Sequence, residues 1–157
     1  DMFKKWGEKG YEGGELKFPT GPIKKVGEGF TQEFQNGVLT RNPDGKNQVS
    51  FGAIGKKYKD MGGADSPLGF PTDGEKKVEG GFFQEFEHGS IYWSPESGAH
   101  YILKGAIMDE WGKKGWEHGE FGWPTSDYSE IAAGGLKQEF QHGTISEVMG
   151  RVQAEKK

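Results

Sequence analysis

The stretch SPLGFPTDGE, residues 66–75, places the large apolar residues Leu68 and Phe70 in a segment rich in breakers of regular structure. Pro71 pushes the residue before it into an extended conformation. Alternate residues of an extended segment point to the same side, so Leu68 and Phe70 share one face. We predict that this segment is a buried clasp whose two apolar side chains fill the gap between a helix and a sheet.

The clasp occurs three times at a fixed spacing. Its copies are LKFPT (16–20), LGFPT (68–72) and FGWPT (121–125), and their prolines lie 52 and 53 residues apart. Two further features repeat in phase with it: QEFQNG (32–37), QEFEHG (84–89) and QEFQHG (138–143) downstream, and Trp6, Tyr58 and Trp111 upstream. A fixed period near 50 is typical of an array built from one supersecondary unit.

Each unit is predicted to begin with a short helix. In the middle copy, Ile54, Tyr58 and Met61 fall on one helical face, and Gly62-Gly63 follows as a stop. The matching pairs in the other copies are Met2 with Trp6 and Ile107 with Trp111. We interpret these aromatic residues as core anchors.

A β-hairpin is predicted after each clasp. In GFFQEFEHGSIYW (81–93), a turn at His88-Gly89 would place Phe86 opposite Ile91, Gln84 opposite Trp93 and Glu85 opposite Tyr92. A second turn leads to a third strand at 99–103, or at 48–51 in the first copy. The third copy lacks this turn and ends in polar RVQAEKK (151–157).

These patterns predict an α+β fold of three tandem repeats, 1–52, 53–105 and 106–157. Each holds a short helix, the aromatic-proline loop and a three-stranded meander. A segment of this size cannot bury both faces of its sheet alone, so neighbouring repeats are expected to pack side by side. The sequence leaves open whether they form an open stack or surround a pseudo-rotation axis.

Composition excludes several classes of protein. Lys and Arg total 20 against 24 Asp and Glu, a net charge of −4, which disfavours nucleic acid as a partner. Cysteine is absent, the four histidines lack metal-ligand spacing, and no apolar run reaches the length of a membrane span. Because the chain opens at Asp1 inside the repeat pattern, we interpret it as a mature fragment or a piece cut from a longer protein.

The sequence holds no motif for a nucleophile, a phosphate-binding loop or a cofactor, so we expect no catalytic residue, cofactor or metal. Glu85 and Glu87 could form a glycosidase pair, but the first copy has Gln35 in place of Glu87. We favour the interpretation that the Gln and Glu residues of the QEF arms bond to nearby backbone or lysine.

A repeated binding module fits the pattern better than an enzyme, because tandem weak sites gain avidity on a polymer such as a polysaccharide. Proteins bind sugars through aromatic faces, on which the sugar rings stack, and through carboxylate or amide groups, which bond to the sugar hydroxyls. Tyr92 and Trp116 are the expected exposed platforms. The full set of candidate ligand-binding residues is Tyr92, Trp116, Trp93, Tyr101, Trp123 and Glu85.

The clasps LKFPT, LGFPT and FGWPT, with GGFFQEFEHGSIYWSPESGAHYI and GAIMDEW (105–111), resemble the LGFP repeat over essentially the whole chain. The resemblance implies a carboxy-terminal appendage of an exported cell-wall enzyme, as in the corynebacterial trehalose mycolyltransferase. The α/β-hydrolase portion of such an enzyme is not in this chain. The four residues Leu-Gly-Phe-Pro that give the repeat its name are altered in two copies. Lys17 replaces the glycine in the first copy, and Phe121 and Trp123 replace the leucine and phenylalanine in the third.

The resulting expectation is a non-catalytic module, secreted to the cell envelope. It would anchor a covalently linked, N-terminal mycolyltransferase domain to wall polysaccharide, arabinogalactan or peptidoglycan. Two alternatives stay open. One is a structural or protein-interaction module that stabilises the enzyme without touching glycan, and the other is a glycan-cleaving enzyme.

Overall fold

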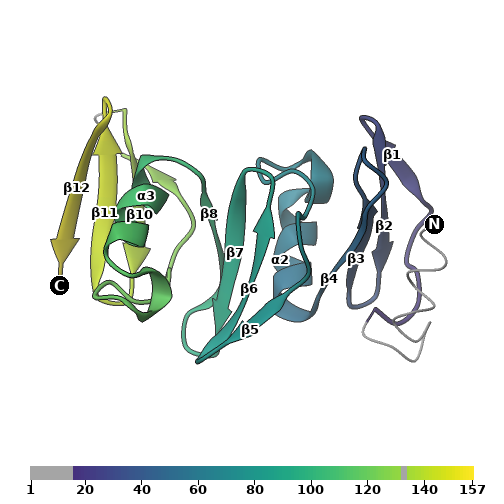
Figure 1. Cartoon of the computed structure of the whole chain (residues 1–157), viewed down its shortest axis with the longest axis horizontal. Helices are drawn as coiled ribbons and strands as arrows, with labels where there is room; N and C mark the ends of the chain where they lie inside the picture. The colour runs from purple at the N-terminus through teal and green to yellow at the C-terminus, as the bar shows by residue number, and fades with distance from the viewer. Residues whose placement is uncertain (1–15, 132–133) are drawn as a thin grey trace.

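The computed structural model describes residues 16–131 and 134–157. This part of the chain forms three four-stranded antiparallel sheets and two α-helices (Figure 1). The first sheet has the order β1 (Lys24–Val26), β2 (Gly29–Phe34), β3 (Gly37–Arg41), β4 (Asn47–Phe51). The second has the order β5 (Lys76–Val78), β6 (Gly81–Phe86), β7 (Gly89–Ser94), β8 (Gly98–Leu103). The third is β9 (Ser129–Glu130), β10 (Leu136–Phe140), β11 (Gly143–Val148) and β12 (Arg151–Lys156).

Sheets and helices alternate along the long axis of the molecule. Helix α2 (Gly52–Met61) lies between the first and second sheets, and α3 (Ala106–Lys113) lies between the second and third (Figure 1). A one-turn 3-10 helix follows each of them, η2 (Gly63–Asp65) and η3 (Trp116–His118). The strands β1 and β12 stand at opposite ends of this stack. The arrangement that the sequence left open is therefore a layered stack in the described residues.

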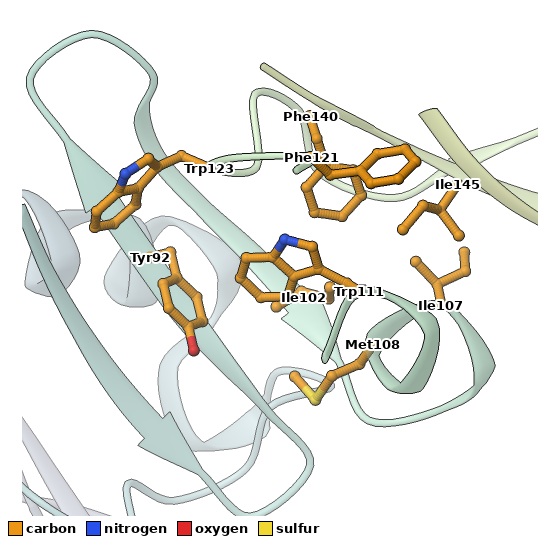
Figure 2. Close-up of a cluster of buried hydrophobic side chains, with 9 residues drawn as sticks. All are labelled: Tyr92, Ile102, Ile107, Met108, Trp111, Phe121, Trp123, Phe140 and Ile145. Atoms are coloured by element: carbon orange, nitrogen blue, oxygen red, sulfur yellow. The ribbon is translucent and has the colours of Figure 1, made fainter. Parts of the chain in front are cut away.

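Each helix buries apolar side chains against the sheets on both of its sides. One buried cluster joins Val38 of the first sheet to Ile54 and Tyr58 of α2 and to Phe86 and Ile91 of the second sheet. A larger cluster surrounds α3 and draws on the second and third sheets (Figure 2): Tyr92, Ile102, Ile107, Met108, Trp111, Phe121, Trp123, Phe140 and Ile145. Neighbouring repeats thus share their cores, and the prediction that they pack side by side is confirmed.

The helix aromatics are core anchors, as predicted. Tyr58 and Trp111 have no exposed surface. The Tyr58 hydroxyl donates to Gly69 O at 2.7 Å, and Trp111 Nε1 donates to Gly122 O at 3.0 Å. Each anchor therefore fastens its helix to the next clasp, and it satisfies a buried polar group while doing so. The predicted pair Met2 and Trp6 lies outside the described residues.

The second and third clasps are buried, and their two apolar side chains have different partners. Leu68 is fully buried beneath its own sheet, whereas Phe70 is 7% exposed and reaches Gly29 of the preceding sheet. Trp123 likewise packs against Tyr92 of the preceding sheet. The first apolar residue of the clasp therefore packs in the core beneath its own sheet, and the second contacts the sheet of the preceding repeat.

Phe18 departs from this pattern, and its predicted burial is wrong. Its side chain is 55% exposed, although Leu16 beside it is completely buried. The second clasp aromatic packs on the sheet of a preceding repeat, and the described residues include no sheet before β1.

The register of the central hairpin also differs from the prediction. Phe86 pairs with Gly89 and Gln84 pairs with Ile91, so the turn consists of Glu87 and His88. The predicted pairing was displaced by two residues because His88-Gly89 resembles a turn dipeptide. A displacement of two leaves every side chain on its predicted face, since side chains alternate with a period of two.

Each sheet has one strand more than the predicted meander. The additional strands β1, β5 and β9 are only two or three residues long and pair with the outer edge of the hairpin. The prediction that the third copy lacks the second turn is wrong, because the polar tail forms β12, which pairs with β11 over six residues. Its turn is Met149-Gly150, with φ of 51° and 82°, and backbone of this hand suits a tight hairpin turn.

Candidate functional site: a groove between the second and third repeats

The polar QEF arms are largely used by the fold. Gln84 is fully buried, and its amide donates to Val49 O and Asp73 O. Glu87 Oε1 accepts a hydrogen bond from Phe70 N at 2.9 Å, and Glu85 lies 3.6 Å from Lys76 Nζ. The interpretation that these residues bond to backbone or lysine is confirmed.

A groove opens where the second sheet meets α3 and η3. Its volume is about 450 Å³, and strands β6 and β7 form its floor. The lining residues are Phe83, Glu85, Ser90, Tyr92, Lys104, Met108, Trp116 and Glu117. Three of the six residues predicted to bind a ligand, Glu85, Tyr92 and Trp116, therefore come together here.

Trp116 is the exposed aromatic platform of the groove, as predicted. Its side chain is 43% exposed and stands edge-on to the buried Trp111, with ring centroids 5.5 Å apart. Its φ of 61° lies in the left-handed region, directly after Gly115 at 103°. This local backbone turns the indole outward while its edge stays packed against α3.

Tyr92 is not the exposed platform that the sequence suggested. It is only 7% exposed because its ring packs edge-on against Trp111 at 4.9 Å. Figure 2 shows its hydroxyl directed away from Phe140 and Ile145. Burial, reinforced by the carboxylates of Glu117 and Glu85, raises the pKa of Tyr92 well above its ordinary value, so the hydroxyl stays protonated.

Phe83 supplies a second apolar surface, which was not predicted from the sequence. Its ring stacks on Tyr92 at 5.1 Å with an interplanar angle of 10°. Lys76 Nζ lies 5.7 Å from the centroid of the same ring. Strict alternation along β6 places Phe83 and Glu85 on one face, and this could have identified Phe83 as a neighbour of Tyr92.

Charged groups of both signs border the aromatic surfaces. Glu85 and Lys104 lie at exposed positions, whereas the Glu117 side chain is only 10% exposed. Carboxylates accept hydrogen bonds and an ammonium group donates them. The groove can therefore contact a flat apolar surface and bond hydroxyl groups beside it.

The other three candidate residues lie elsewhere. Trp93 is half-buried on the opposite face of the second sheet, against the cluster around α2. Tyr101 lies beneath Lys57, whose Nζ is 5.7 Å from the ring centroid. Trp123 is 7% exposed between Tyr92 and His118, at centroid distances of 6.0 and 6.4 Å. None of the three lines the groove.

The first and second repeats form a related but chemically different groove. Its volume is about 140 Å³, and its lining includes Thr31, Glu33, Val38 and Gly63. These match Phe83, Glu85, Ser90 and Trp116 of the second groove in position along the repeat. The carboxylate is kept, whereas both aromatic surfaces are missing from the first groove.

The described residues bear on two other kinds of site. No group of three His, Asp or Glu side chains there could hold a metal ion. No helix within residues 16–131 and 134–157 has the length and apolar character needed to cross a membrane.

Neighbouring units of the chain share buried cores. The second and third clasps each contact the preceding sheet, and each helix anchor bonds to the next clasp. These contacts define a tandem-repeat protein. The pattern of the LGFP repeat matches the chain at residues 16–66 and 68–119. The chain therefore belongs to the LGFP repeat family. A comparison with curated proteins finds no match. Each family match begins at a clasp, and the boundaries 53–105 and 106–157 stay a prediction.

Proposed function

We propose that this chain is a non-catalytic module that binds polysaccharide of the cell envelope. The observation that carries the proposal is the groove at Trp116, which joins an exposed indole and the Phe83 ring to the carboxylates of Glu85 and Glu117. Sugar rings present C–H faces that stack on aromatic side chains and hydroxyl groups that bond to carboxylates.

Membership of the family supports the proposed location. LGFP repeats are a domain type associated with cell-wall anchoring, and the comparisons find these repeats and no catalytic domain in the chain. We extend the proposal to arabinogalactan, alone or joined to peptidoglycan, as the polymer. We also propose that the module belongs to a secreted mycolyltransferase and retains that enzyme in the wall.

A structural role is the second candidate function. Its support is that most of the aromatic residues of the repeats are buried in cores shared between neighbours. A module of this kind would stabilise an attached enzyme, or join proteins, without contacting glycan. The two functions differ in whether the isolated chain binds polysaccharide.

The test is sedimentation of the purified chain with purified arabinogalactan or with peptidoglycan–arabinogalactan sacculi at low salt. We expect the chain in the pellet, with release by soluble arabinogalactan. Recovery of the whole chain in the supernatant would exclude direct glycan anchoring and favour the structural role.

A further inference from the structure

A second hollow lies on the opposite face of the second sheet from the Trp116 groove. Its volume is about 150 Å³, and it opens between the first turn of α2 and the strands β6 and β7. Its lining is mostly apolar: Phe51, Gly52, Ala53, Ile54, Glu75, Phe82 and Trp93. We refer to these seven residues as the α2 slot.

Two aromatic rings and one aliphatic side chain shape the slot. Phe82 and Trp93 face each other across strands β6 and β7, with centroids 5.8 Å apart and planes inclined by 38°. Ile54 is 2% exposed. Glu75 supplies the slot's charged side chain, and its Oε2 accepts a hydrogen bond from Phe51 N at 2.7 Å.

The next repeat fills the matching position with its own side chain. Tyr128 occupies the place in the repeat that Glu75 occupies one unit earlier, and Leu136 likewise replaces Phe82. Tyr128 packs with Leu136 against the core around α3, and its hydroxyl donates to Leu103 O at 2.9 Å. Burial raises the pKa of Tyr128 to about 12, so the phenol stays a hydrogen-bond donor.

The comparison of the two repeats indicates what the α2 slot accepts. In one repeat a phenol ring lies between the helix and the sheet, and in the other a shorter carboxylate takes its place beside an open apolar space. A volume of about 150 Å³ is that of a cavity that holds one benzene ring. The Glu75 carboxylate can accept a hydrogen bond from a phenol hydroxyl.

We propose that the α2 slot is a binding site for one tyrosine side chain of a partner polypeptide, whose ring would fill the space between helix and sheet that the Tyr128 ring fills in the following repeat. The phenol ring lies between Phe82, Trp93 and Ile54, and its hydroxyl faces Glu75. The carboxylate of Glu75 disfavours a ligand that brings a negative charge to the same place. This site is independent of glycan binding at Trp116, because the two lie on opposite faces of the second sheet.

The experiment is an NMR titration of the full chain with p-cresol, the side-chain analogue of tyrosine, followed through the indole N–H signals. We expect saturable shifts of the Trp93 signal at millimolar concentrations, as suits a ligand of about eight heavy atoms, and weaker effects of toluene. The absence of a saturable shift at Trp93 in the wild-type chain would overturn the proposal.

Two variants make the assignment specific. Glu75→Tyr copies the third repeat and should fill the slot, so that the Trp93 signal no longer responds to p-cresol. Tyr128→Ala opens the matching space beside α3 and should add a second p-cresol site, read from the methyl signals of Ile107, the counterpart of Ile54 in the same cluster as Tyr128. A response of Trp93 to a methyl glycoside in place of p-cresol would reject the tyrosine assignment and make the slot a sugar site.

Discussion

The indole of Trp123 lies over Gly81 of the preceding sheet, where a Cβ atom would come within 2.8 Å of Trp123 Cη2. The first interface repeats this relationship, since a Cβ on Gly29 would stand 2.5 Å from Phe70 Cζ. The glycine at the start of the hairpin therefore leaves room both for the paired strand, at Trp93 O or Arg41 O, and for the clasp aromatic of the next repeat. Repeats are joined by this contact between an aromatic ring and bare backbone.

We predict that Gly81→Ala destabilises the chain by about 1–3 kcal/mol, because the added methyl group would clash with Trp93 O in β7 and lie 2.8 Å from the Trp123 ring, so that β7 and Trp123 must move. Gly29→Ala should act in the same direction through Phe70. The measurement is the free energy of unfolding from urea titration. Gly21→Ala is the matched control, since a Cβ at Gly21 would meet no atom within 4 Å. Equal effects of Gly21→Ala and Gly81→Ala would contradict the account.

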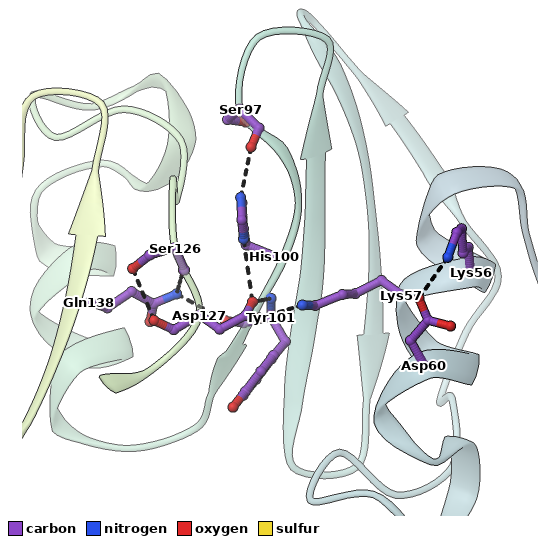
Figure 3. Close-up of polar contacts among 9 residues, drawn as sticks. All are labelled: Lys56, Lys57, Asp60, Ser97, His100, Tyr101, Ser126, Asp127 and Gln138. Atoms are coloured by element: carbon purple, nitrogen blue, oxygen red, sulfur yellow. Dashed lines mark hydrogen bonds and ion pairs between the residues drawn. The ribbon is translucent and has the colours of Figure 1, made fainter. Parts of the chain in front are cut away.

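The side-chain amide of the glutamine in each QEF arm makes a second contact between repeats. Gln138 Nε2 donates to Tyr101 O of the preceding sheet and to Ser126 O of the clasp loop, both at 2.9 Å (Figure 3). Gln84 makes the same pair of bonds one repeat earlier, to Val49 O and Asp73 O. Both glutamines are completely buried.

Gln84→Ala and Gln138→Ala should each cost about 1–3 kcal/mol of stability, because two buried carbonyl groups lose their donor. Gln32→Ala provides an internal comparison. Within the described residues, Gln32 donates only to Gly21 O, at 3.1 Å in a half-buried setting. Gln32→Ala should lose clearly less stability than the other two variants, as measured by calorimetric unfolding. A loss of stability as large as that of Gln138→Ala would argue against a role of the buried glutamines in joining repeats.

Much of the fold could be predicted because its main signals are local. The period of the clasps gives the repeat, and the alternation along residues 81–93 gives the correct face for every hairpin side chain. The short strands β1, β5 and β9 were missed because two or three residues carry no periodic pattern. The turn before β12 was missed because Met149 is not a typical turn residue, although Met149-Gly150 forms the turn.

The candidate site was harder to predict because exposure depends on the neighbouring repeat. Tyr92 stands on a strand face that looks free within one unit, and α3 of the next unit covers it. Trp116 follows a helix end, where the left-handed backbone after Gly115 turns it outward, so the prediction of its exposure is confirmed.

Asp127 connects the second and third repeats through its carboxylate. It pairs with Lys57 of α2, accepts from Tyr101 N at 3.2 Å, and lies 3.4 Å from His100 Nδ1 (Figure 3). Burial alone would raise its pKa, but the hydrogen bonds from His100, Lys57 and Tyr101 outweigh burial and hold the pKa below its ordinary value of 3.8.

This shift predicts a stability loss in acid. Because the pKa of Asp127 is lower in the folded chain than in the unfolded chain, its contribution is full above 3.8 and is lost as the pH falls through 3.8 towards the folded value. Asp127→Asn should therefore be less stable than the wild type at pH 7, with a difference that shrinks below about pH 4. Chemical unfolding over a pH series measures it.

Asp60→Asn is the control for the loss of one charge. Asp60 pairs with Lys56 at 2.8 Å, but their side chains are 60% and 76% exposed, so solvent screens the pair. We expect a smaller change in stability at pH 7, further reduced by added salt. If Asp60→Asn matched Asp127→Asn over the whole pH series, the half-buried pair at Asp127 would have no special role.

The two inter-repeat grooves provide a direct test of glycan binding, because Gly63 and Trp116 occupy matching positions. Both have a φ of 61°, and a Cβ at Gly63 would meet no atom within 4 Å. The first groove also has Thr31 where the second has Phe83. The first groove therefore has space for the aromatic surfaces of the second, and a tryptophan at position 63 would carry the same left-handed backbone strain that Trp116 carries.

We predict that Trp116→Ala weakens binding to arabinogalactan about tenfold, which corresponds to a contact worth about 1.4 kcal/mol. Thr31→Phe combined with Gly63→Trp should strengthen binding, because a second aromatic groove adds avidity on one polymer chain. Sedimentation with sacculi gives the affinities, and circular dichroism confirms that each variant is folded. Folded variants that all bind like the wild type would place any glycan contact outside these grooves and would withdraw the support that Trp116 gives to the proposed function.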